Sequence, residues 1–173
     1  MAKLFIQTLP SQEEIQQSVS QIQPNADTWA LHSHLMLMKV ATEFENHFDT
    51  FLAPFNLSSG RFTLLLMLNR EPGGLMPSEL SQRVGVTQAT ISGLLNGLEK
   101  AELLRREVHE KDGRAFVIKI TEKGQNVIKD IFPRWSSHIT QFWSRFPEEE
   151  RNFLSRTLEG MVHHVAALGG NLK

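Results

Sequence analysis

Residues 88–100, QATISGLLNGLEK, combine an apolar stripe with a face of small polar side chains. The stripe takes the i, i+3, i+4, i+7 positions and predicts a helix that packs on one side. On the opposite face, Gln and Asn can bond adenine edges, Ser and Thr can bond bases or phosphates, and Ala can contact thymine methyl groups. This chemistry suits a helix that lies in the major groove of DNA. The stripe consists of Ile91, Leu94, Leu95 and Leu98, and the polar face of Gln88, Ala89, Thr90, Ser92, Gly93, Asn96 and Lys100.

Two glycines interrupt this predicted helix, at Gly93 and Gly97. Each costs about 1 kcal/mol of helix stability relative to Ala. Two such costs in one helix favour a close approach by another surface, which is either DNA or a packed neighbour. A plain solvated face that tolerates two glycines is the alternative interpretation.

A short helix precedes this stretch, and a charged hairpin follows it. Residues 77–84 begin with a proline suited to a first helical turn, and Gly85 permits a sharp turn before the helix predicted over 88–103. After it come a strand in LLRREVH, the turn dipeptide Asp112-Gly113 and an alternating strand to residue 120. This order predicts a winged helix-turn-helix. Because a lone hairpin is barely stable in water, we expect Phe116, Ile118 and Ile120 to pack on the helices behind it.

The rest of the chain reads as helices. A small helix between two prolines, residues 10–24, has the S-x-x-E capping box at Ser11 and Glu14. Its stripe of Ile15, Val19 and Ile22 is too narrow to fold alone, so it must dock on another surface, for example that of another subunit. The other helices are expected from Asp27 or Thr28 to about residue 52, over 60–71 after a cap at Ser58 or Ser59, over 121–146 with a kink at Pro133, and over 147–168.

Composition excludes several classes of protein. The chain has 173 residues, 40% of them hydrophobic and none of them cysteine, so disulfides, thiolate metal sites and thiol redox sensing are absent. No apolar run is long enough for a membrane span, and the N-terminus carries no signal peptide pattern. We therefore expect a cytoplasmic protein. The net charge is −1, with residues 61–123 mildly basic at +2 from ten Lys or Arg and eight Asp or Glu.

No enzyme is indicated. No Ser, Lys or Asp stands in a nucleophile arrangement, and His109-Glu110 lacks the second His of a zinc-protease motif because Gly113 occupies that position. Seven histidines leave a metal-responsive protein open as an alternative, although no His pair has i, i+4 spacing. We expect no catalytic residue, no cofactor and no resident metal.

Residues 79–124 resemble the MarR (multiple antibiotic resistance regulator) family of bacterial transcription factors. The resemblance rests on TISGLLNGLEK in the second helix, Arg106 before the wing, DGR at 112–114 and ITEKG at 120–124, in the family's order and spacing. The helices on either side extend it to about residues 27–168. Two features depart from the family pattern. Glu102 stands where a glycine is common after the second helix, and glycine stands at 93 or 97 where a basic residue is common.

The resemblance implies a mainly α fold with a small β-hairpin wing. It also implies a division of the chain into regions. Residues 1–25 are an extension with a docking helix, 26–57 and 122–168 form a helical dimerisation region, 58–121 form the winged helix-turn-helix, and 169–173 are a tail. The resemblance further implies a homodimer with intertwined terminal helices that binds a palindromic operator. It also implies frequent release by a small, often aromatic or phenolic ligand, held between the dimer region and the winged helix. A winged-helix module for protein–protein interaction without a DNA role is the alternative.

The resemblance and the helical wheel together give the candidate DNA-binding and ligand-binding residues. For DNA binding they are the seven residues of the polar face, together with Thr87, Arg106, Lys111, Asp112 and Arg114. We expect Arg114 to contact DNA and Asp112 to position it, with Arg106 sharing that carboxylate. For the ligand pocket the candidates are His34, Met38 and Phe62. One of Trp29, Trp135 and Trp143, which otherwise suit a dimer core, could also line it.

Overall fold

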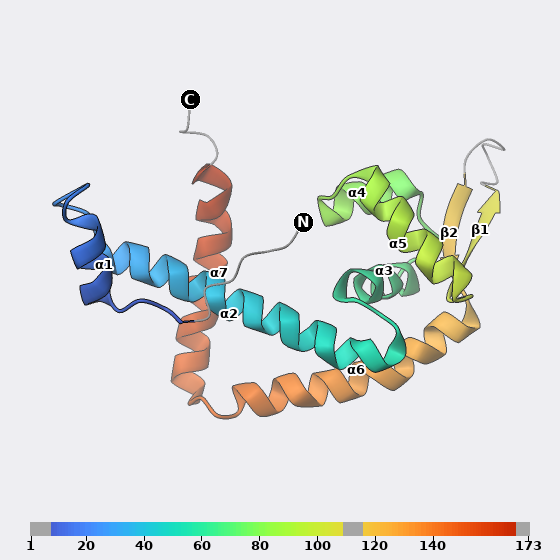
Figure 1. The fold of residues 1–173 in the computed structure, drawn as a ribbon. Coiled ribbons are helices and arrows are strands. Elements are labelled where there is room, and N and C mark those ends of the chain that lie inside the picture. Colours follow the sequence, from blue (N-terminus) through green and yellow to red (C-terminus); the bar gives the residue numbers. More distant parts are fainter. Residues whose placement is uncertain (1–7, 109–115, 169–173) are drawn as a thin grey trace. The chain divides into compact units, whose positions relative to one another are not determined.

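The computed structural model describes residues 8–108 and 116–168 and divides into two compact units between Ile120 and Thr121 (Figure 1). The fold is mainly α with one two-stranded antiparallel hairpin, as predicted. The first unit contains α1 (Gln12–Val19), α2 (Thr28–Leu52), the short 3-10 helix η1 (Ala53–Phe55), α3 (Ser59–Asn69), α4 (Pro77–Val84), α5 (Gln88–Lys100), β1 (Leu104–Val108) and β2 (Phe116–Ile120); the second contains α6 (Glu122–Trp143) and α7 (Glu148–Leu168).

Helices begin at the predicted capping residues. The Ser11 hydroxyl accepts a hydrogen bond from the Glu14 N–H at 3.2 Å, and the Glu14 carboxylate accepts one from the Ser11 N–H at 2.7 Å, which completes the capping box. The side chains of Asp27, Ser58 and Thr121 each accept one hydrogen bond from a backbone N–H in the first turn of α2, α3 and α6, respectively. These starts need only local chemistry, because each cap satisfies a backbone N–H of the first turn.

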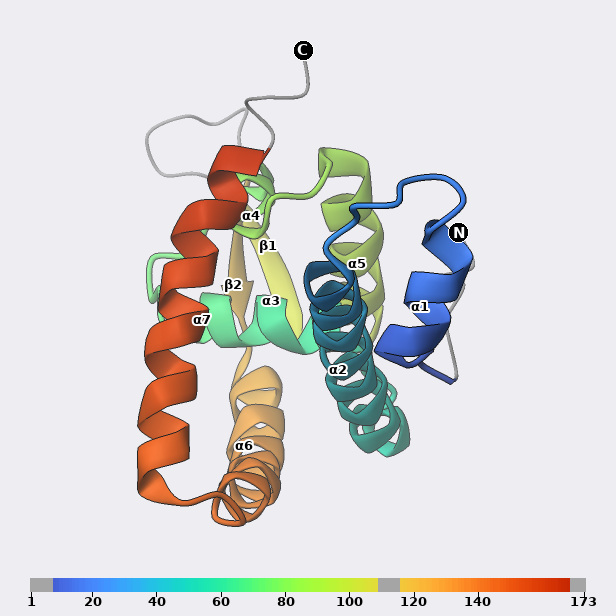
Figure 2. The ribbon, with the colours of Figure 1, turned by 90° about the vertical axis from the view of Figure 1, so that its left-hand side faces the viewer.

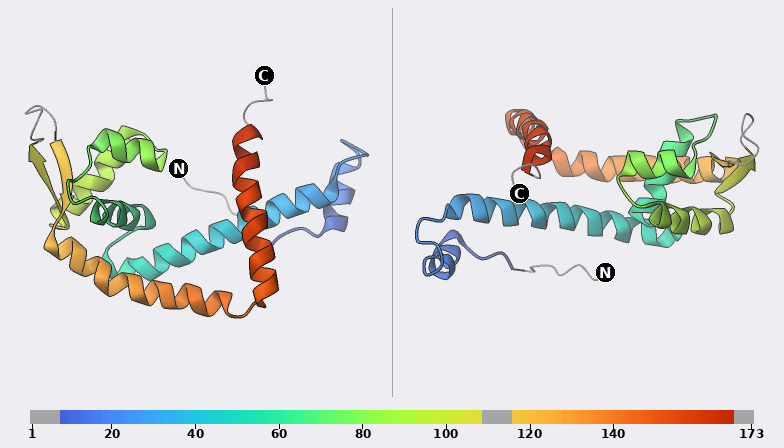
Figure 3. Two further views of the ribbon diagram at one scale, coloured as in Figure 1. Left: turned by 180° about the vertical axis from the view of Figure 1, so that it is seen from behind. Right: turned by 90° about the horizontal axis from the view of Figure 1, so that it is seen from above.

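The ends of the helices are less regular than expected. Helix α1 stops at Val19, so Ile22 lies outside it and is exposed, which corrects the prediction of one stripe through residue 22. Ile15 is buried, and α1 packs against α2 of the same chain (Figures 2 and 3). The suggested docking on another subunit is therefore not needed for this helix. Helix α2 ends at Leu52, as predicted, and the 3-10 helix η1, with Pro54 in its first turn, follows it to Phe55.

The core of the first unit surrounds α3, which is apolar on nearly every side. Phe62 is buried and meets Phe48 of α2 edge-on, with ring centroids 5.9 Å apart. Burying side chains of this size contributes about 1.5–3 kcal/mol each. The fully buried residues of this unit are Leu52, Phe62, Leu64, Leu65, Leu68, Leu80, Ile91, Leu95, Leu98 and Ile118.

The hairpin gains its stability from its second strand. Ile118 is fully buried and also pairs with Leu75, through hydrogen bonds of 3.1 Å from the Leu75 N–H and 2.8 Å from the Ile118 N–H. Gly74 makes this approach possible, because it has a φ of 81° and an added Cβ would lie 2.7 Å from the Ile118 carbonyl oxygen. Phe116 does not pack as predicted and is 52% exposed. It pairs with Val108 at the far end of the hairpin, where both side chains face solvent.

In the described parts of the chain no single helix is long and apolar enough to cross a bilayer. The segments Thr28–Phe55 and Ser59–Asn69 reach the length and apolar composition of a membrane span only together, and they are bent by 77° at their junction. Helix α3 is largely buried within its own unit, which accounts for its apolar composition.

Candidate nucleic-acid interface

Helix α5 presents the predicted polar face to solvent. All seven residues of that face are exposed, while Ile91, Leu95 and Leu98 are buried and Leu94 is half-buried. The predicted stripe therefore fixes the helix against the first unit, where α5 contacts α3, α4 and β1. Its outer side carries donors and acceptors that no other part of the described chain covers.

The turn before α5 is held by its own side chains. Gly85 ends α4 with a φ of 71°, the left-handed conformation that glycine adopts without strain. Thr87 caps α5 by accepting from the Thr90 N–H at 3.2 Å, and the two hydroxyl oxygens lie 2.9 Å apart. Both threonines thus order the first turn of the helix while remaining exposed.

The two glycines of α5 have different surroundings. At Gly97 an added Cβ would lie 2.6 Å from Nη2 of Arg61, so the guanidinium group of α3 occupies the space of a side chain. At Gly93 nothing lies within 4 Å of an added Cβ. The Arg61 guanidinium group is the far end of a flexible side chain and can move aside, so it favours a glycine at 97 without requiring one. Gly93 leaves an open surface at the centre of the polar face.

Arg106 joins the first strand of the wing to α5. Its Nη2 donates to Oδ1 of Asn96 at 2.6 Å, and its Nε lies 3.1 Å from Oε2 of Glu99. Sequence reasoning placed both Arg106 and Asn96 at the DNA surface but did not connect them. The strand-to-helix contact depends on the pairing register and could not be read from local patterns.

A second charged group lies on the hairpin and was missed from the sequence. Glu107 accepts from Nε of Arg105 at 2.6 Å and lies 2.8 Å from Nζ of Lys119 on the opposite strand. Hydrogen bonds from Lys119 and Arg105 lower the pKa of Glu107 below its ordinary value. The strand alternation, which places these residues on one face, was the available signal. The wing-tip candidates Lys111, Asp112 and Arg114 lie outside the described residues.

Comparison with known proteins identifies this arrangement. Residues 55–115 match the model of the MarR family. Relatives align along much of the chain. The transcriptional repressor YetL of Bacillus subtilis is 28% identical over 143 residues, which cover 82% of this chain and 86% of YetL. The transcriptional regulator PecS of Dickeya dadantii is 27% identical, with 75% and 79% covered. The chain thus matches a MarR-family model over residues 55–115 and is similar to HTH-type transcriptional regulators over most of its length.

Solved structures of MarR-family proteins share the fold. The MepR–DNA complex from S. aureus has a TM-score of 0.68 at 24% identity and covers 76% of this chain and 96% of MepR. CouR from Rhodococcus jostii RHA1, solved with p-coumaroyl-CoA, has a TM-score of 0.63 at 21% identity, covering 74% and 90%. These likenesses show the winged-helix fold. The family-model match and the relatives, which are named as transcriptional regulators and not as enzymes, indicate a DNA-binding transcriptional regulator.

The three candidates for the ligand pocket lie apart in one copy of the first unit. Phe62 is buried against Phe48, and Met38 lies ten residues before Phe48 in α2, about 15 Å along the helix axis at 1.5 Å per residue. His34 lies one turn farther away and is exposed, as Met38 is. The three candidates are thus spread along α2 and α3 of the first unit.

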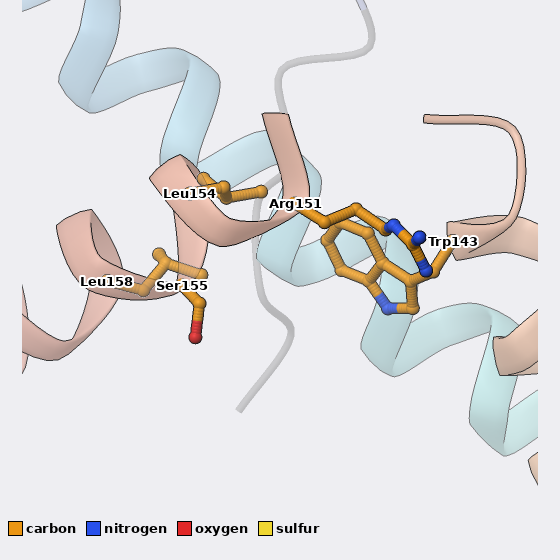
Figure 4. A pocket seen from close by; sticks show the side chains of 5 residues that line it. All are labelled: Trp143, Arg151, Leu154, Ser155 and Leu158. Carbon is orange, nitrogen blue, oxygen red and sulfur yellow. The ribbon is translucent and has the colours of Figure 1, made fainter. Parts of the chain in front are cut away.

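A cavity of about 350 Å³ lies instead in the second unit (Figure 4). Trp143 at the end of α6 lines it together with four residues of α7: Arg151, Leu154, Ser155 and Leu158. Trp143 was among the candidates for a pocket lining, and the α7 residues were not. The described residues contain no group of three or more His, Asp or Glu side chains that could hold a metal ion.

Proposed function

We propose that the protein is a cytoplasmic, homodimeric repressor that binds an inverted-repeat operator and is released by a small organic ligand. The observation that carries this proposal is the polar face of α5, which is exposed along its whole length and fixed from behind by buried leucines and isoleucine. The names of relatives support it, since YetL is called a repressor and MepR was solved with DNA.

The proposed dimer rests on apolar side chains that the described chain leaves uncovered. On α7 these include Leu154, Leu158, Met161 and Val165, and the N-terminal half of α2 exposes Trp29, Leu31, Met36, Leu37, Met38 and Val40. Large contiguous apolar patches are uncommon on monomers and mark interfaces. A two-fold dimer would then present its two α5 helices about 34 Å apart, one turn of DNA.

Wing contacts complete the proposed interface. Arg114 would reach the DNA backbone or the minor groove, and Asp112 would position its guanidinium group across the Gly113 turn. The planar fork of Arg can hold a carboxylate and still donate to DNA. Arg114→Ala should weaken operator binding by about 1–3 kcal/mol without changing the melting temperature. Equal affinity of parent and variant across a salt series would contradict this role of the wing.

The decisive test of DNA binding uses the open surface at Gly93. The parent protein is incubated with a random duplex pool, bound sequences are selected, and affinity is measured over a salt series. Gly93→Glu adds a carboxylate to the proposed groove-facing side and should abolish selection, because it repels phosphate. Gly73→Glu is the matched control, since an added Cβ also meets nothing within 4 Å there, and it should bind like the parent.

The test has two contradicting outcomes. If the parent selects no sequence, a protein–protein module without a DNA role becomes the better interpretation. If the selected sites lack two-fold character, the proposed arrangement of the two α5 helices fails.

The proposed effector is tested by release of the selected DNA. Phenolic and aromatic carboxylic compounds are added to the complex, and fluorescence anisotropy of labelled DNA reports dissociation. Two locations are compared through Met38→Ala in α2 and Leu158→Ala in α7, the second of which lines the cavity. Loss of the response in one variant, with DNA affinity retained, identifies the site. No release by any such compound would remove the ligand from the proposal.

A further inference from the structure

The contact between Arg106 and Asn96 determines which atoms the recognition helix offers to DNA. Arginine has five N–H donors and no acceptor, so the atom that receives its 2.6 Å hydrogen bond must be the amide oxygen of Asn96. The Asn96 amide cannot turn over without placing its own N–H groups against the guanidinium group. The orientation of this amide is therefore fixed by its partner.

The orientation leaves the amide nitrogen of Asn96 as the group free to meet a base edge. Asn96 is exposed and lies one turn beyond Ser92 on the polar face of α5. In the major groove, guanine O6 and thymine O4 accept hydrogen bonds, whereas adenine N6 and cytosine N4 donate them. Purine N7 also accepts, so a side chain that presents N–H groups matches guanine at O6 and N7 and thymine at O4. On adenine it meets one acceptor beside a donor, and on cytosine it meets a donor.

We infer that Arg106 is a positioning residue that makes Asn96 read a keto base, guanine or thymine, at one position of each operator half-site. The inference rests on the DNA-binding role proposed above. It differs from the simpler expectation that Asn96 pairs bidentately with adenine, which requires the oxygen already bonded to Arg106 to accept from adenine N6 as well. Arg106 itself need not touch a base.

Glu99 holds the arginine in place. Its carboxylate lies 3.1 Å from Nε of Arg106, so the guanidinium group is bound at two points to residues one helical turn apart. Ion pairs of this exposure contribute little to folding, and the side chains of Arg106 and Glu99 are 37% and 40% exposed. The value of the pair lies in orientation, because a fixed group loses less freedom on binding.

The experiment compares selected sequences from the random duplex pool for the parent and Arg106→Ala. The parent should select guanine or thymine at one position and its symmetry-related mate. Arg106→Ala frees the amide to turn, so adenine and cytosine at that position should rise about two- to tenfold, the effect of one neutral hydrogen bond. Glu99→Gln keeps the side-chain shape and loosens the arginine, so it should shift the same position in the same direction by less.

Two variants separate positioning from other roles. Arg105→Ala removes an arginine of the same strand whose side chain bonds Glu107, and it should change no base preference. In an Asn96→Ala background, Arg106→Ala should also leave the base preference unchanged. A uniform loss of affinity in Arg106→Ala at every sequence, or adenine selected by the parent at each position that Asn96→Ala relaxes, overturns the inference. If the parent selects nothing, it is the proposed function that fails.

Discussion

Helices α5 and α7 carry apolar stripes of the same spacing, yet the two stripes differ in exposure. Ile91, Leu95 and Leu98 of α5 are at most 1% exposed, while on α7 the exposed fraction rises from 36% at Leu154 to 60% at Val165. The spacing determines which side of each helix is apolar, but it does not determine what covers that side. The apolar stripe of α5 is buried by other residues of its own unit, whereas the apolar stripe of α7 is exposed in the described chain.

The largest expected effect tests the covered stripe. Leu95→Ala should lower the free energy of unfolding by about 2–5 kcal/mol, because it leaves a cavity in a packed core. Urea denaturation followed by circular dichroism measures the loss. Ser92→Ala, on the exposed side of the same helix, is the control and should change stability little. A loss below about 1 kcal/mol at Leu95 would mean that α5 is not held by its stripe.

The next effect tests the uncovered stripe. Leu158→Glu should raise the dissociation constant of the proposed dimer about 30-fold or more, the scale of an interface hot spot, since a carboxylate would be buried against apolar groups. Sedimentation equilibrium over a range of concentrations gives the constant. Arg156→Glu lies away from the stripe and should leave association unchanged. A folded monomer of the parent at micromolar concentration would show that no second chain covers α7.

A smaller effect concerns the end of α5. Glu102 has a φ of 61°, a left-handed conformation that costs a residue with a Cβ about 1–2 kcal/mol. Glu102→Gly should therefore raise the free energy of unfolding by about 1 kcal/mol. Glu102→Ala separates backbone strain from charge, because it removes the carboxylate and keeps the Cβ. Equal stabilisation by both variants would assign the effect to the charge.

The smallest effect is a pH dependence in the wing. The lowered pKa of Glu107 means that its stabilising contribution is complete above the ordinary pKa of Glu, about 4.3, and is lost as the pH falls through the folded-state value. Glu107→Gln should be slightly less stable than the parent at pH 7, and the difference should vanish on acidification. Urea denaturation at pH 7 and at an acidic pH measures the difference in the free energy of unfolding. A difference that persists in acid would point to packing instead of charge.

Local patterns predicted much of the fold. Ser11, Asp27 and Thr121 act as caps within four residues of the N–H groups they accept from, so short sequence windows contained the necessary information. The exposed face of α5 likewise followed from helical periodicity alone. The two strands of the hairpin and their antiparallel pairing followed from the turn dipeptide and the alternation.

Contacts between distant residues were not predictable in this way. Gly97 makes room for Arg61, and Arg106 bonds Asn96, because separate elements meet in the folded unit. Phe116 was expected in the core from the same alternation that correctly buried Ile118. Its exposure reflects its distance along the strand from the covering helices, which the alternation does not encode.

The pair of hydrogen bonds between Leu75 and Ile118 has a consequence for experiments on opening of the fold. It joins the residue just before α4 to the middle of β2, so α4, α5 and β1 lie inside one closed loop of chain. The amide protons of Leu75 and Ile118 can exchange with solvent only when that closure breaks. Their exchange rates, measured by NMR with and without DNA, would thus report how often this closure opens in the free and in the bound protein.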